Sequence, residues 1–147
     1  MRMGSLTAVP KESQPVAILP ESECWKLLSS VMLGCLITSV DGEPEVFPVN
    51  FAVQDRKLLF RTAEGTKLVS SAINHNVIFE ADNYDQFEGW SVIVRGFTRL
   101  LQDDEIAAAE QAGLVPWTAP EKQHFVQIRP LRVTGRRFTF DRTSTSE

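Results

Sequence analysis

Short apolar runs separated by turn-forming residues constrain the fold of this chain more than any other feature. The run EVFPVNFAV (45–53) alternates, so that Phe47, Val49, Phe51 and Val53 share one face, as the side chains of a half-buried strand do. Similar runs, rich in β-branched and aromatic residues, recur along the chain. The other segments that we predict as strands are 35–40, 58–62, 77–82, 90–101 and 124–140.

Turn residues join these runs at the spacing of hairpins. DGEP (41–44) follows the first run, and in it Gly42 supplies a positive φ while Asp-Gly favours a tight turn. We expect the last strand to be broken or bulged at Pro130 and Gly135. Strands that succeed one another in this way predict an antiparallel sheet of about six strands. The fold class is therefore mainly β, and closure into a small barrel is the most economical arrangement.

Short helices interrupt the succession of strands. SECWKLLSSV (22–31) has apolar side chains at helical spacing, with Ser22 as a possible N-cap and Gly34 as its end. Two further helices are predicted at 66–74 and 103–114.

One domain accounts for the 147 residues. Residues 1–19 hold two prolines among polar residues and are expected to be a flexible lead-in, 20–140 the domain, and 141–147 a disordered tail. The net charge of −4 offers no basic excess for a nucleic acid or a membrane surface. No apolar run approaches the roughly 18–20 residues that span a bilayer.

The two cysteines, Cys24 and Cys35, have no metal-type spacing and no histidine nearby. The N-terminus lacks the apolar segment of a signal peptide. We therefore predict reduced, buried thiols, no metal site and a cytoplasmic location.

The most suggestive turn for binding is FRTAEGTKL (60–68). A helix that begins there would present unpaired backbone N–H groups and the positive end of its dipole. The turn adds the cations Arg61 and Lys67 and hydroxyl groups at Thr62 and Thr66, while Gly65 would let a ligand approach the backbone. These are the parts of a phosphate site. A plain capped helix with surface charges is the alternative, and the spacing is not that of a Walker loop.

Two further stretches suggest a flat ligand. Pro48 within the alternating strand FPVNF removes a ladder N–H, so that the strand lies at an edge or is bulged there, and Asn50 places an amide between aromatic residues. EGWSV opens a later strand with Trp90 and Ser91. A barrel-edge proline and ordinary core packing of the tryptophan are the alternatives.

Other candidates are weaker. His75 could cap a helix and His124 is isolated. A basic cluster in the last strand is expected to balance acidic residues at 103–105. It consists of Arg129, Arg132, Arg136 and Arg137. We nominate no catalytic residue, because no Ser-His-Asp, Cys-His or paired-carboxylate pattern is present.

Taken together, ECWKLLSSVMLGCLITSVDGEPEVFPVNF, LLFRTAEGTKL, VIFEADNYDQFEGWSVIVRG and VQIRPLRVTGRRF resemble the pyridoxamine 5′-phosphate oxidase-related, FMN-binding split-barrel proteins. The resemblance covers about residues 20–140. The FRT-x-x-GTKL and GWSV-x-V-x-G stretches are specific in combination rather than singly.

The resemblance implies a six-stranded antiparallel split barrel that forms a homodimer, with one FMN per subunit in a groove at the interface. By matching positions, the FMN phosphate would be held by Arg61, Thr62, Thr66 and Lys67, next to Gly65. Val49, Asn50 and Phe51 would line the isoalloxazine ring, partly through backbone groups. Trp90 and Ser91 would reach the flavin bound mainly by the other subunit.

The function implied is that of an FMN-dependent oxidoreductase acting on an unknown small molecule. VTGRRF (133–138) matches the substrate segment of the oxidase itself only loosely, so the resemblance does not define the substrate. The alternatives are a non-catalytic binder of flavin, haem or bilin, and a deazaflavin-dependent reductase.

Overall fold

The fold is a closed antiparallel barrel with one additional strand. The computed structural model describes residues 15–63, 72, 75–102, 104–106 and 123–140. The elements are β1 (Val16–Leu19), α1 (Glu21–Leu28), β2 (Leu33–Val40), β3 (Glu43–Gln54), β4 (Lys57–Ala63), β5 (Asn76–Tyr84), β6 (Glu88–Leu100) and β7 (Gln123–Thr139). The strands hydrogen-bond in the order β1-β7-β4-β3-β2-β5-β6, and β6 also pairs with β7. Strands β2 to β7 therefore close into a six-stranded barrel, which confirms the predicted fold class.

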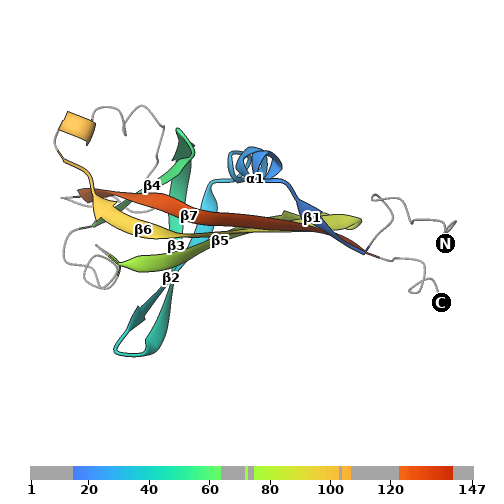
Figure 1. The fold of residues 1–147 in the computed structure, drawn as a ribbon, viewed down its shortest axis with the longest axis horizontal. Helices are drawn as coiled ribbons and strands as arrows, with labels where there is room; N and C mark the ends of the chain where they lie inside the picture. Colours follow the sequence, from blue (N-terminus) through green and yellow to red (C-terminus); the bar gives the residue numbers. More distant parts are fainter. Residues whose placement is uncertain (1–14, 64–71, 73–74, 103, 107–122, 141–147) are drawn as a thin grey trace, which may run out of the picture.

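Each of the six predicted strands coincides with an observed strand to within two residues at either end. β7 is the longest and runs along the long axis of the molecule, whereas the β2–β3 hairpin projects away from it (Figure 1). The barrel is split, because β2 pairs with β5 only at Cys35–Ile37 and β3 pairs with β4 only from Phe51 onward.

Two tight hairpins share one backbone geometry, which the sequence predicts for the Asp41-Gly42 turn. Asp41 and Gly42 have φ values of 51° and 80°, and Asp55 and Arg56 have φ values of 53° and 55°. Positive φ at both central residues is what a type I′ turn requires, and its twist matches that of the flanking strands.

Alternating side chains fill the barrel interior. Val49 and Phe51 of β3 are buried, and Phe47 and Val53 pack against the same core, as the sequence pattern predicts. The Phe51 and Phe79 rings meet edge to face, with 4.7 Å between their centroids and 68° between their planes. Such a pair contributes about 0.5–1.5 kcal/mol beyond the burial of its area.

The first helix is shorter than its sequence pattern suggests. α1 begins after Pro20 without a side-chain cap and ends at Leu28, so the predicted cap at Ser22 and the predicted end at Gly34 are both wrong. Gly34 lies within β2. A Cβ atom there would come within 2.3 Å of the Phe79 ring, so the glycine makes room for the core. α1 packs its buried face, Cys24, Trp25 and Leu28, against β7 and β6.

β7 departs from the ladder at one of the two predicted positions. Arg95 pairs with Arg132 and Gly96 with Pro130, so that Leu131 is the extra residue of a bulge. Gly135, by contrast, pairs without interruption with both β1 and β6. A side chain there would meet the Cys24 Sγ at 2.6 Å, so this glycine admits α1 rather than breaking the strand.

Residues 16–19, which we expected to belong to the lead-in, form a strand instead. Val16–Leu19 form β1, which pairs with Gly135–Phe138 of β7. Of the helix predicted at 66–74, only Ala72 lies within the described residues. Of the helix predicted at 103–114, residues 104–106 are helical and most of the others lie outside the described residues. No helix in the described part of the chain is long and apolar enough to cross a bilayer.

Candidate functional site

The split in the barrel opens a cavity between β2 and β5. Its volume is about 640 Å³. One wall consists of residues 30–32, the first three residues of β2 (33–35) and Pro48 of β3. The other wall consists of residues 80–83 of β5. The cavity exists because the two strands separate beyond their short paired stretch. Its size is within the range of small-molecule sites.

A carboxyl group of unusual basicity lines this cavity. The Ser91 hydroxyl of β6 donates a hydrogen bond to Glu80 Oε2 at 3.0 Å. Burial raises the pKa of Glu80 to about 7, and hydrogen bonding with Asp82 adds to this rise, whereas the Ser91 hydrogen bond opposes it. Perturbed carboxyl groups in a cavity are typical of functional sites. Sequence reasoning missed this group, because its hydrogen-bond partner Ser91 lies on a different strand and its burial depends on the folded barrel.

Both cysteines are free. Cys24 is buried and Cys35 is half-buried beside Glu80. Burial, followed by the nearby carboxylates, raises the pKa of each thiol. Neither is therefore an activated nucleophile, since thiolate formation is disfavoured.

The FPVNF stretch runs from the cavity to β4. Pro48 lines the cavity and pairs with Cys35 without a register shift. It lies where β3 has no β4 partner among the described residues, as expected of an edge proline. The side chains of Val49 and Phe51 point into the core and that of Asn50 is half-buried, so a ligand here would meet mainly backbone.

Only part of the predicted phosphate turn lies within the described residues. Thr62 is buried and Arg61 is half-buried at the end of β4. The Arg61 guanidinium carbon lies 4.9 Å from the centroid of the Phe125 ring, a cation–π contact that fixes the side chain. Arg61 lies next to Phe60, the partner of Phe51, so the structure brings this cation close to the FPVNF stretch. Gly65, Thr66 and Lys67 lie outside the described residues.

Trp90 and Ser91 face opposite sides of β6. Trp90 packs in the core and is only 9% exposed. The edge that remains exposed lines a second cleft of about 340 Å³. Ser91 is half-buried on the outer face, where it pairs in register with Asp82 and with Arg136.

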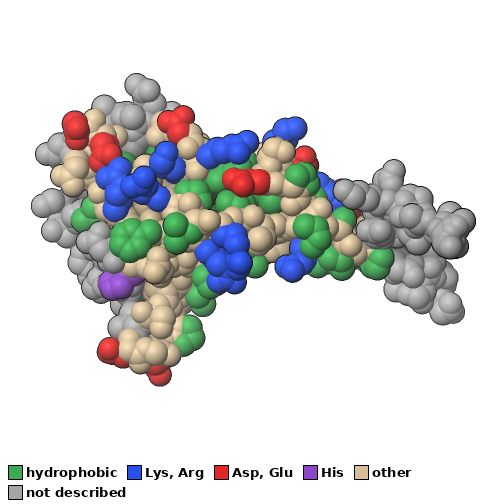
Figure 2. Space-filling view, in the orientation of Figure 1, with side chains coloured by type: hydrophobic (Ala, Val, Ile, Leu, Met, Phe, Trp, Pro, Cys, Tyr) green, Lys and Arg blue, Asp and Glu red, His purple; other side chains and the backbone are tan. Residues whose placement is uncertain are grey.

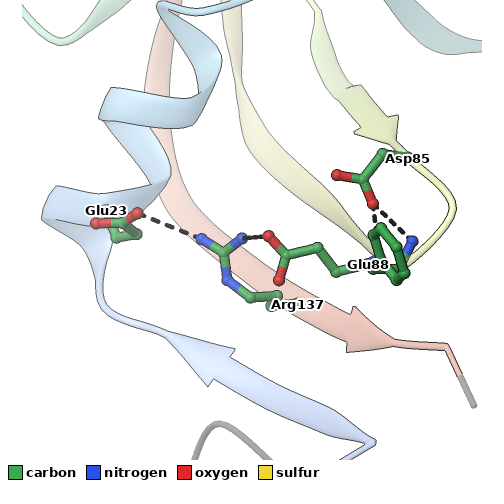
Figure 3. Close-up of polar contacts among 5 residues, drawn as sticks. Glu23, Asp85, Glu88 and Arg137 are labelled. Carbon is green, nitrogen blue, oxygen red and sulfur yellow. Dashed lines mark hydrogen bonds and ion pairs between the residues drawn. The ribbon is translucent and has the colours of Figure 1, made fainter.

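The second cleft is closed on one side by an ion-pair cluster (Figure 3). Arg137 of β7 contacts Glu23 of α1 at 3.4 Å and Glu88 of β6 at 3.3 Å. Beside it, the Asp85 carboxylate accepts hydrogen bonds from the N–H groups of Phe87 and Glu88, and these hold its pKa below the ordinary value. The cluster joins α1 to the β5–β6 hairpin.

Of the acidic residues that the basic cluster was expected to balance, Asp103 lies outside the described residues and Glu105 does not pair with the cluster. Glu105 instead pairs with Arg99 of β6, through contacts of 3.1 and 2.6 Å. The Arg99 guanidinium, assisted by a backbone N–H, lowers the pKa of Glu105 to about 2. Arg137 is bound to Glu23 and Glu88, whereas the other members of the cluster lie exposed along the outer face; they are Arg129, Arg132 and Arg136.

Neither histidine joins the candidate site. The His75 side chain is exposed, and the backbone carbonyl of His75 accepts a hydrogen bond from the Thr98 N–H. The side chain of His124 lies outside the described residues. The buried Thr98 also donates to the Ala72 carbonyl and accepts from the His75 N–H. Sequence reasoning missed this anchor, because a lone threonine in a strand gives no sign of a partner more than 20 residues away.

Known proteins match the chain closely. The family model described as pyridoxamine 5′-phosphate oxidase matches residues 20–137. A solved structure of an FAD-binding protein from Mycobacterium smegmatis is 56% identical, covers 85% of this chain and 100% of its own, and has a TM-score of 0.80. The uncharacterized protein Rv0080 of Mycobacterium tuberculosis is 34% identical over an alignment of 148 positions that covers 96% of this chain and 97% of its own length.

Proposed function

The chain belongs to the pyridoxamine 5′-phosphate oxidase family, and we propose that it is a flavin-binding oxidoreductase acting on a small molecule. The observation that carries this proposal is the 56% identity with the M. smegmatis protein, which is named for FAD binding and is matched over 100% of its length. A bound flavin would supply the hydride or electron transfer. The protein would position the ring and exclude water.

The described residues have the chemistry that a flavin phosphate and ring require. Arg61 offers a guanidinium fixed against Phe125, and Thr62 offers a hydroxyl, at the end of β4. Gly65, Thr66 and Lys67 would complete the phosphate site. The ring would lie along the backbone of Val49, Asn50 and Phe51, beside the cavity in the split. Ser91 and the rim of Trp90 would contact it from the second subunit.

FMN is the cofactor that we propose, because the residues named above account for one phosphate and one ring. The name of the M. smegmatis protein favours FAD as a second candidate. The two flavins share the isoalloxazine ring and the ribityl phosphate, so the same residues would serve both. The free thiols of Cys24 and Cys35 support our placement of the protein in the cytoplasm.

The outer face of the sheet supports the proposal of a homodimer. Val46, Leu33, Phe97 and Leu131 are exposed there by 60%, 44%, 40% and 75%. Register places Ile37 between Val46 and Ile78, and Leu131 lines one cleft with Ile78 and Arg95, so that the apolar side chains form a band interrupted by Arg95. Hydrophobic side chains are interleaved with Lys and Arg on the visible face (Figure 2). Such exposed apolar area in a folded domain is typical of a protein interface.

The test is to purify the protein and identify what it releases on denaturation. We expect a yellow protein that releases FMN, or FAD under the second candidate. A colourless protein that binds neither flavin on titration would overturn the proposal. Flavin-loaded protein that is neither reduced by NAD(P)H nor reoxidised by an acceptor would instead show a binding protein without oxidoreductase activity.

A further inference from the structure

A serine hydroxyl and two carboxyl groups lie together on the outer face of the sheet beside the cavity. Asp82 and Glu80 stand on the same side of β5, and Ser91 stands opposite Asp82 on β6. The Ser91 hydroxyl is directed to Glu80 rather than to its direct cross-strand neighbour, with 3.0 Å between Oγ and Oε2. Asp82 is a second carboxyl group two residues along the same strand, and its proximity contributes to the raised pKa of Glu80. The hydrogen bond that the geometry establishes is the one from Ser91 to Glu80.

This arrangement determines what the Ser91 oxygen can offer a ligand. A serine hydroxyl has one hydrogen to donate and two lone pairs that accept. Once its hydrogen is committed to Glu80, only the acceptor lone pairs remain. A ligand at this point must then bring a donor, such as the imide N–H at the edge of an isoalloxazine ring.

We propose that Glu80 is a positioning residue, which orients the Ser91 hydroxyl so that its oxygen accepts a hydrogen bond from a ring N–H of the bound flavin. The inference rests on the proposed function, because it assigns a role within the same flavin site. Glu80 does not need to touch the flavin. Its effect passes through the hydroxyl of Ser91.

The groups around Glu80 make this orientation sensitive to pH. β5 contributes Asp82, β2 the Cys35 thiol and β6 the Ser91 hydroxyl, with Arg95 two residues beyond Ile93, the register partner of Glu80. β7 places Arg136 opposite Ser91. Burial and Asp82 bring the titration of Glu80 near neutrality. An ionised carboxylate is the stronger acceptor for a hydroxyl, so Ser91 is held more firmly as pH rises.

The experiment is a titration of the apoprotein with riboflavin between about pH 5.5 and 8.5, the range around the pKa of Glu80. Riboflavin carries the isoalloxazine ring without the FMN phosphate, whose own pKa of about 6 would otherwise make the affinity depend on pH. For the wild type we expect affinity to rise by roughly three- to tenfold across this range, which is the difference between a neutral and a charge-assisted hydrogen bond. Glu80→Gln keeps an acceptor but cannot ionise, so its affinity should not change with pH. Glu43→Gln removes a carboxylate from the exposed β2–β3 hairpin and should keep the wild-type profile.

Ser91→Ala decides whether Glu80 acts through the hydroxyl. We expect this variant to lose the pH dependence, and Glu80→Gln added to it to change affinity no further. A pH dependence that persists in Ser91→Ala, or a wild-type profile in Glu80→Gln, would overturn the inference while leaving flavin binding intact. A wild type that binds no flavin at any pH would overturn the inference together with the proposed function.

Discussion

Arg61 shows how a single side chain is prepared for an anion. Its guanidinium is held against the Phe125 ring at the end of β4, and an arginine whose conformation is already restricted loses less entropy when it binds a phosphate. The sequence could suggest this role because its neighbours in the chain, Thr62, Thr66 and Lys67, carry matching donors. It could not show the contact with Phe125, because that residue is distant in sequence and becomes the cross-strand neighbour of Arg61 only when β4 pairs with β7.

Replacing Arg61 should weaken flavin binding without unfolding the protein. A charge-assisted hydrogen bond contributes about 1.5–3 kcal/mol, so Arg61→Gln should lower flavin affinity by roughly ten- to a hundredfold. Titration of the apoprotein with FMN and with FAD measures this, with thermal unfolding as a check of the fold. Arg56→Gln, on the β3–β4 turn, is the matched control. Equal affinity in Arg61→Gln and the control would remove Arg61 from the phosphate site.

Glu80 should also make the free energy of unfolding depend on pH. Its pKa is raised from 4.5 to about 7 in the folded protein, so the folded state binds the proton more tightly than the unfolded state. That contribution is fully present below about pH 4.5 and is lost as pH rises through about 7. We expect Glu80→Gln to flatten this part of the stability profile. Urea unfolding at several pH values measures it, and parallel profiles would contradict the assigned cause.

At the scale of elements, the sequence predicted those features that interactions between neighbouring residues determine, and it missed those that depend on distant strands. Asp41-Gly42 and the alternation of β3 fixed a hairpin and its buried face, because turn conformation and side-chain direction follow from neighbouring residues. β1 was missed, because its partner Gly135–Phe138 lies at the far end of the chain. Gly34 was misassigned for the same reason: what excludes a side chain there is Phe79 on another strand.

The link between β6 and residues 72–75 provides a test of such a distant contact. Thr98 is fully buried and hydrogen-bonds with Ala72 and His75. Thr98→Val would leave these backbone groups without partners, and each such group costs about 1–3 kcal/mol. We expect a loss of stability of that order on urea unfolding, whereas Thr134→Val, an exposed site on β7, should change little. Equal stability of the two variants would show that Thr98 is not an anchor.

For the whole molecule, the closed barrel explains why the candidate site is assembled from distant residues. Pro48, Glu80 and Ser91 come from β3, β5 and β6, and they gather where the barrel splits. The sequence could nominate FPVNF and EGWSV separately, because each holds an unusual residue. It could not predict the cavity between them, which depends on how far β2 and β5 remain paired.

The apolar band on the outer face leads to a prediction about the oligomeric state of the protein. A stable interface buries about 800 Å² on each partner, and a charge introduced within it is removed from water without a partner. Leu131→Asp and Val46→Asp should therefore shift the protein from dimer to monomer in sedimentation equilibrium. Phe87→Asp, at the exposed β5–β6 turn, should leave the dimer intact.

Flavin affinity in the same variants tests whether the site is shared between subunits. If Ser91 and Trp90 act on the flavin of the second subunit, a monomer retains the phosphate contacts and those of the FPVNF backbone but loses the contacts that Ser91 and Trp90 make to the ring. Affinity should then fall together with dimerisation and recover as protein concentration rises, because binding and association are linked. A monomeric Leu131→Asp with wild-type affinity at every concentration would mean that one subunit holds the flavin alone.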